Sequence, residues 1–122
     1  MRFDKNKLPE LINELISFLL KNERALDTVI YANDKCYRFE EKDKYTPVKT
    51  ENGIYYISND NMCSSCEYRN DDTVTMIFEG PLYDLLNYET GSDEEIEFKR
   101  IFEKYGLYYE LGHAWSLAAY EE

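Results

Sequence analysis

The residues best suited to chemistry by type and spacing are Cys63 and Cys66, which two serines separate. Two thiolates at this spacing can chelate one metal ion or form a redox pair. A tetrahedral zinc site needs two further ligands, and the soft ligands that remain are Cys36 and His113. The chain has no second chelating pair of the usual form. We therefore expect no cofactor, with a zinc-stabilised structural module built on the Cys63–Cys66 loop as the alternative.

Strand alternation also argues against a shared zinc ion. If the aromatic rings of Tyr37 and Phe39 face the core, Cys36 points outward. His113 alternates in phase with Leu111, which predicts an inward position. The two side chains would then lie on opposite sides of the sheet, where they cannot bind one ion.

Few other residues point to catalysis. His113 is the only histidine, and at an alternating strand position a packed, hydrogen-bonded histidine is the commoner finding. The sequence contains no Gly-rich phosphate loop, nucleophile elbow, zinc-protease helix or EF-hand loop. We lean towards a non-enzymatic protein. A small thiol-dependent enzyme with Cys63 or Cys66 as nucleophile is a second alternative, tested by the search for a thiolate of low pKa.

The charge of the chain is strongly negative and unevenly distributed. The net charge is −11; residues 1–50 sum to +1 and residues 51–122 to −12. Nucleic acids and anionic membranes attract basic surfaces, so we expect neither as a direct partner. The field of the second half can steer a basic protein towards it. Solubility alone is the simpler explanation of the same charge.

These features predict an acidic protein-interaction module that binds a basic protein surface such as that of a nuclease. Inhibitors, immunity proteins and DNA mimics share such bulk traits, which makes this an analogy and not a motif. Twelve tyrosines fit the hypothesis, because tyrosine is enriched at contact surfaces. The predicted partner-binding residues are acidic or aromatic side chains of the second half: Asp71, Asp72, Glu79, Asp84, Glu89, Tyr108 and Tyr120.

The sequence predicts a cytoplasmic location. The longest apolar run near the N-terminus, Leu15 to Leu20, is too short and too late for a secretory signal. No stretch approaches the roughly 20 apolar residues of a membrane span. An odd number of cysteines favours reduced thiols. The composition is also compatible with a low-GC bacterial or phage source.

Hydrophobic periodicity predicts a helix over residues 7–22, capped by Asn6. Short strands and hairpin turns follow up to Phe78. The expected turns are Asn33-Asp34-Lys35, Glu51-Asn52-Gly53 and Asn70-Asp71-Asp72.

The second half predicts two helices and one strand. Gly80-Pro81 opens the first helix, and a capping box of Ser92 and Glu95 opens the second. Helix stabilisation explains the acidic run over residues 89–97 better than a binding role does. From Leu107 onwards the sequence alternates as one long strand, with a bulge or bend at Gly112.

The whole pattern predicts one α+β domain over residues 1–122. Its largely antiparallel sheet has five to seven short strands, and the N-terminal helix and two helices of the C-terminal half pack mainly on one face. The expected buried core comprises Leu11, Leu15, Leu19, Met76, Phe78, Leu85, Ile101, Phe102 and Leu117.

Overall fold

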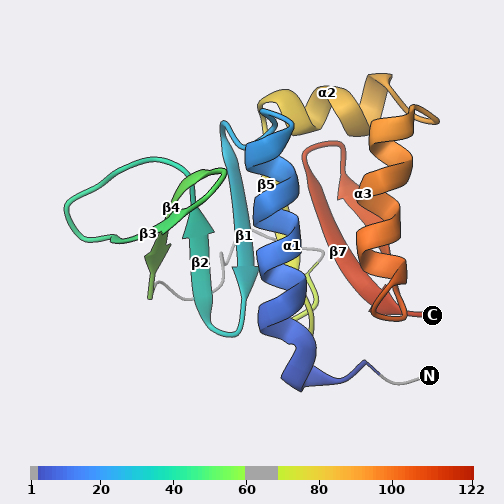
Figure 1. The fold of residues 1–122 in the computed structure, drawn as a ribbon. Coiled ribbons are helices and arrows are strands. Elements are labelled where there is room, and N and C mark those ends of the chain that lie inside the picture. Colours follow the sequence, from blue (N-terminus) through green and yellow to red (C-terminus); the bar gives the residue numbers. More distant parts are fainter. Residues whose placement is uncertain (1–2, 60–68) are drawn as a thin grey trace.

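A single antiparallel sheet organises the chain (Figure 1). The computed structural model describes residues 3–59 and 69–122. Seven strands follow the order β3-β4-β2-β1-β5-β7-β6 across the sheet, and all neighbours are antiparallel. The predicted α+β class and strand number are confirmed. The strands are β1 (Thr28–Ala32), β2 (Lys35–Arg38), β3 (Thr46–Thr50), β4 (Gly53–Ser58), β5 (Thr75–Phe78), β6 (Leu107–His113) and β7 (Ser116–Glu121).

The described residues form three α-helices, as predicted. They are α1 (Leu8–Lys21), α2 (Pro81–Tyr88) and α3 (Asp93–Glu103), and a 3-10 turn, η1 (Lys5–Lys7), precedes α1. Helices α1 and α3 lie side by side over one face of the sheet, and α2 crosses the upper end in this view (Figure 1). No helix in the described ranges has the length and apolar character needed to cross a bilayer.

The N-terminal helix forms where the apolar spacing predicts it, but its cap differs. The Asp4 carboxylate accepts a hydrogen bond from the Asn6 backbone amide at 2.9 Å and caps η1. Lys7 occupies the N-cap of α1 without a side-chain hydrogen bond. The prediction that Asn6 caps the helix is therefore wrong, because the extra 3-10 turn moves the capping role upstream.

Helix α3 begins at the predicted cap. Ser92 Oγ accepts a hydrogen bond from the Glu95 amide at 3.2 Å. The Glu95 carboxylate accepts from the amide of Gly91, one residue before the cap, at 2.9 Å. It also pairs with Lys99 one turn later. Gly106 lies in the turn after the helix with a φ of 75°, a left-handed conformation that glycine adopts without strain.

Two predicted hairpins form with two-residue turns. Asn33 and Asp34 join β1 to β2 with φ values of 54° and 60°, the left-handed pair that hairpin turns favour. Glu51 and Asn52 join β3 to β4. The first strand of the third predicted hairpin, Cys66–Arg69, lies almost wholly outside the described residues.

The C-terminal segment is a hairpin and not one long strand. Ala114 and Trp115 form the turn between β6 and β7, and His113 pairs with Ser116 across it. The predicted irregularity at Gly112 is confirmed, since the register shifts between Leu111 and His113. The prediction of one strand failed because alternation continues through a turn that lacks Gly, Asn and Asp.

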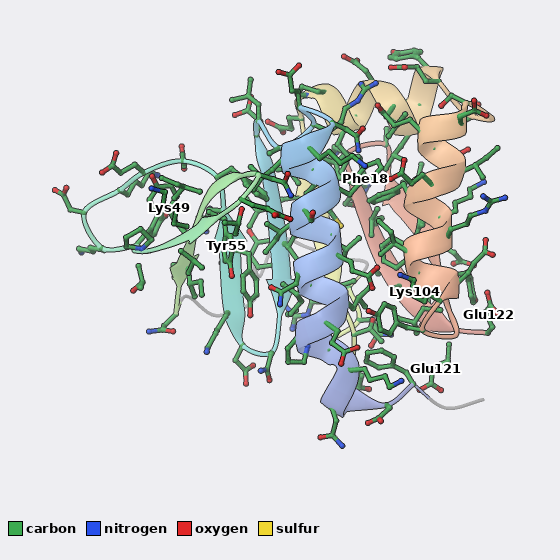
Figure 2. The ribbon with its side chains drawn as sticks, in the orientation of Figure 1. Phe18, Lys49, Tyr55, Lys104, Glu121 and Glu122 are labelled. Carbon is green, nitrogen blue, oxygen red and sulfur yellow. The ribbon has the colours of Figure 1, made fainter. Side chains whose placement is uncertain are left out.

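The hydrophobic core lies between the helices and the sheet. Of the nine residues predicted to be buried, eight are fully buried, and Ile101 is partly buried at the edge of the core. Aromatic rings link the layers: Phe98 lies 5.2 Å from Phe18, 5.3 Å from Phe102 and 5.4 Å from Tyr109 between ring centroids. Figure 2 shows Phe18 between α1 and α3.

Candidate binding pocket

The metal hypothesis finds no support in the described part of the chain. Cys63 and Cys66, its essential pair, lie outside the described residues. Over residues 3–59 and 69–122, no three His, Cys, Asp or Glu side chains come close enough together to hold a metal ion.

The two remaining zinc candidates are far apart. Cys36 lies in β2 and His113 at the end of β6, with three strands between them, a separation of about 19 Å at ~4.8 Å a strand. Cys36 faces away from the helices, as the alternation predicts, and on that face it is fully buried against Tyr31. The inward position predicted for His113 is wrong: it is half-buried, and the bulge at Gly112 moves it out of phase with Leu111.

The predicted partner-binding residues occupy three separate places. Asp71 and Asp72 precede β5, where they pair with Arg69 and Lys5. Glu79 follows β5, at the opposite end of that strand.

Asp84 and Glu89 lie on and just after α2. Glu89 pairs with Arg24 at 3.2 Å, which gives this carboxylate an internal role. Glu79 and Asp84 are exposed and form no ion pair or side-chain hydrogen bond with another described residue.

The two predicted tyrosines pack on each other. Tyr108 of β6 and Tyr120 of β7 are direct cross-strand neighbours with ring centroids 6.0 Å apart. The register places them on the face of the sheet turned away from the helices, because their neighbours Tyr109 and Ala119 belong to the core under α3. They therefore lie apart from the acidic residues around α2.

A pocket of about 440 Å³ opens at the α2 end of the sheet. Four chain segments that are distant in sequence line this β1–β5 pocket. The start of β1, the ends of β2 and β5 and the β6–β7 turn all lie at this end of the sheet (Figure 1). The lining residues are Leu26, Asp27, Thr28, Val29, Arg38, Phe39, Glu40, Ile77, Phe78, Glu79 and Trp115.

A close backbone approach fixes the rim of the pocket. The Glu79 amide donates to the Asp27 carbonyl at 3.2 Å. A Cβ on Gly80 would lie 2.3 Å from the Leu26 carbonyl oxygen, closer than real Cβ contacts come. Glycine at position 80 therefore lets the segment before β1 lie directly against the start of α2.

Arg24 holds the same corner together. Its Nε lies 2.6 Å from Glu94, and its two terminal nitrogens lie 3.2 Å from the Glu89 carboxylate oxygens. The guanidinium also donates to the Pro81 carbonyl at 2.9 Å. One side chain in the segment after α1 thus contacts both ends of α2 and the start of α3.

Trp115 enters the pocket wall from the β6–β7 turn. Its carbonyl accepts a hydrogen bond from the Phe78 amide at 2.8 Å. Its indole stacks on the His113 ring, with centroids 4.6 Å apart and planes 9° from parallel. The Asn87 side-chain amide donates to the neighbouring Ala114 carbonyl at 2.8 Å, which joins the turn to α2. The backbone of the turn is therefore fixed by two hydrogen bonds, and the indole itself is supported on one face by His113.

Acidic residues outnumber basic ones in the lining. Among the described lining residues, Asp27, Glu40 and Glu79 carry negative charge and Arg38 carries positive charge. Arg38 has its guanidinium carbon 5.5 Å from the centroid of the Tyr45 ring, and Glu40 pairs with Lys42 at 3.2 Å. Asp27 and Glu79 have no such described partner. The pocket therefore combines an apolar wall with an excess of negative charge, which suits a cationic ligand.

Two other clusters of titratable groups are structural. The pKa of Glu95 lies below its ordinary value. Burial acts to raise this pKa, but the hydrogen bonds from the Gly91 amide, Lys99 and Tyr109 together have the larger, opposite effect. Burial together with Glu95 raises the pKa of the Tyr109 phenol. The Glu14 carboxylate behaves like Glu95, with Lys104 and Tyr105 as its partners. Both clusters fasten α3 to its neighbours, and neither borders the β1–β5 pocket.

Sequence reasoning identified one residue of this pocket, Glu79. Asp27 and Trp115 were missed because nothing in their local sequence indicates that the ends of β1 and β6 meet. Comparison of the chain with models of protein families, with curated proteins and with solved structures found no match.

Proposed function

We propose that this protein is an acidic interaction module that binds a basic protein, and that the α2 end of the molecule carries the contact. One observation carries the proposal: the β1–β5 pocket lies among acidic residues of that end. We define the acidic end as Asp27, Glu79 and Asp84, whose carboxylates have no described internal partner.

The net charge of −11 supports the same hypothesis. Long-range attraction raises the rate of encounter with a basic surface, and local complementarity fixes the register of the complex. The hydrogen bonds of Arg24 to Pro81, Glu89 and Glu94 and the close approach at Gly80 fasten the segments that carry the acidic end. A rigid binding surface lowers the entropic cost of binding.

A binding screen tests the proposal. The purified chain is immobilised and presented with a panel of purified basic proteins, basic nucleases among them, at about 0.05 M and about 0.5 M salt. We expect at least one member to bind at low salt with an affinity that falls about tenfold or more at high salt. The absence of any bound protein at low salt, or binding that is indifferent to salt, would contradict the proposal.

Matched variants separate a defined contact from general attraction. Glu79→Gln removes a charge at the acidic end, and Glu103→Gln removes an equal charge at the C-terminal end of α3. A contact at the acidic end is weakened by the first change far more than by the second. Equal effects would mean that only the net charge matters.

A further inference from the structure

The size of the β1–β5 pocket limits what can enter it. Its volume of about 440 Å³ lies towards the low end of the ~300–1,000 Å³ typical of small-molecule sites. Four apolar side chains, Leu26, Val29, Ile77 and Trp115, form part of the lining, and none of the four is fully buried. This space suits one long side chain with an apolar stem and not a whole segment of chain.

The negative charge of the lining favours a side chain that ends in a cationic group. Asp27 and Glu79 contribute negative charge that no described internal partner neutralises. Arg38, the basic side chain among the described lining residues, has its guanidinium over the Tyr45 ring. An anionic ligand would be repelled by these carboxylates, whereas a cationic ligand would gain their attraction.

The indole distinguishes between the two common cationic side chains. Trp115 stacks almost parallel on His113, which fixes the plane of the indole at the pocket wall. A planar guanidinium stacks on an aromatic face and offers five donors to carboxylates, whereas the strongly hydrated ammonium of lysine does neither as well. The pocket therefore favours arginine over lysine.

We propose that the β1–β5 pocket takes one arginine side chain of the basic partner. The aliphatic stem packs on the apolar wall, the guanidinium stacks on Trp115, and Asp27 and Glu79 balance its charge. This inference rests on the proposed function and names the chemistry that the acidic end recognises.

Trp115 is also the reporter for the test, because it is the only tryptophan. The intact protein is titrated at constant ionic strength with N-acetyl-arginine amide, and in parallel with the lysine and citrulline analogues. We expect a saturable change in tryptophan emission and a shift of the indole N–H signal in the NMR spectrum. The arginine compound should bind about tenfold tighter than citrulline, its uncharged isostere.

Two isosteric substitutions test the carboxylates, and the thermal midpoint of each variant shows whether its fold is unchanged. Glu79→Gln and Asp27→Asn remove the balancing charges, and asparagine tolerates the φ of 58° at position 27. Each should weaken arginine binding severalfold with the thermal midpoint unchanged, while Glu103→Gln leaves binding intact.

The outcomes separate the two proposals. Equal binding of arginine, lysine and citrulline, or no change at Trp115, overturns the arginine inference even if a basic protein still binds in the screen. Arginine binding at Trp115 with no basic protein captured would instead contradict the proposed function and leave a site for a small guanidinium compound.

Discussion

At the start of α3, the Glu95 side chain lies below the protein surface with only 3% of it exposed. It accepts hydrogen bonds from the Gly91 amide and the Tyr109 hydroxyl, and it pairs with Lys99. All three interactions favour the charged carboxylate, so they lower its pKa despite burial. A buried charge with this many partners stabilises the fold only while it stays ionised.

Acid unfolding tests this role. Because the folded-state pKa of Glu95 lies below the ordinary value of 4.5, its contribution is complete above that pH and is lost as the pH falls through the folded-state pKa. We expect Glu95→Gln to be less stable than wild type at pH 7 and to lose less stability between neutral pH and acid. Urea unfolding at several pH values measures both. Glu97→Gln, at an exposed position of the same helix, is the control. If the free energy of unfolding of Glu95→Gln fell as steeply with decreasing pH as that of wild type, the account would be contradicted.

Ser92 gives a second test at the scale of one residue. Its hydroxyl satisfies the Glu95 amide at the first turn of α3. Ser92→Ala should lower the free energy of unfolding by about 1 kcal/mol, because an amide donor loses its partner. Thr90→Ala, at an exposed position two residues earlier, should change it by less than about 0.5 kcal/mol. Equal values for the two variants would show that the cap carries no stability.

Some of these residues are readable from sequence and others are not. Ser92 and Glu95 are readable because a helix start depends on residues three apart. The burial of Cys36 is not, because it depends on Tyr31 across the strand pair and on which face of the sheet the pair occupies.

Among the elements, the junction of β5 and α2 is the most sensitive to one added carbon atom. Gly80→Ala places a methyl group 2.3 Å from the Leu26 carbonyl, so the backbone must move. We expect a loss of about 3 kcal/mol, the upper end for overpacking, and a changed Trp115 emission.

Gly91→Ala provides the comparison for that substitution. Gly91 has a φ of 85° and no atom within 4 Å of an added Cβ. Its replacement therefore costs about 1 kcal/mol of backbone strain and should leave Trp115 unchanged. Similar losses for both variants would mean that the close approach at Gly80 is not what holds the pocket rim.

Packing between the helices and the sheet gives a graded expectation. Leu15→Ala and Phe102→Ala remove fully buried side chains and should each cost about 2–5 kcal/mol. Ile101→Ala should cost less, because its side chain is only partly buried. Chemical denaturation of the three variants measures the order, and a loss below about 0.5 kcal/mol at both buried sites would refute the assignment of the core faces.

Most elements followed from local patterns, and the C-terminal hairpin did not. Apolar stripes and caps are short-range signals, so the helices were predicted within a few residues. The turn at Ala114 and Trp115 is fixed by hydrogen bonds from other elements. The Asn87 side-chain amide donates to the Ala114 carbonyl, and the Phe78 backbone amide donates to the Trp115 carbonyl. A turn fixed by tertiary hydrogen bonds leaves no signal in its own residues.

At the scale of the whole molecule, the pocket brings together residues that are far apart in the sequence. Asp27, Glu79 and Trp115 meet because β1 and β7 both pair with β5. No local pattern predicts that pairing, so the sequence indicated Glu79 by its charge and missed the other two. Residues of opposite charge also lie on opposite sides of the sheet. Lys49 is on the edge strand β3, whereas Glu121 and Glu122 lie on the far side (Figure 2).

The central claim is that a cationic protein binds at the acidic end and not anywhere on a uniformly negative surface. The most direct measurement is the dissociation constant of the tightest partner from the screen, at one fixed salt concentration, for Glu79→Lys and Glu103→Lys. Both variants change the net charge equally, so long-range attraction is matched. We predict that Glu79→Lys weakens binding about tenfold or more, while Glu103→Lys stays within about threefold of wild type. Equal losses, or a greater loss for Glu103→Lys, would contradict the account.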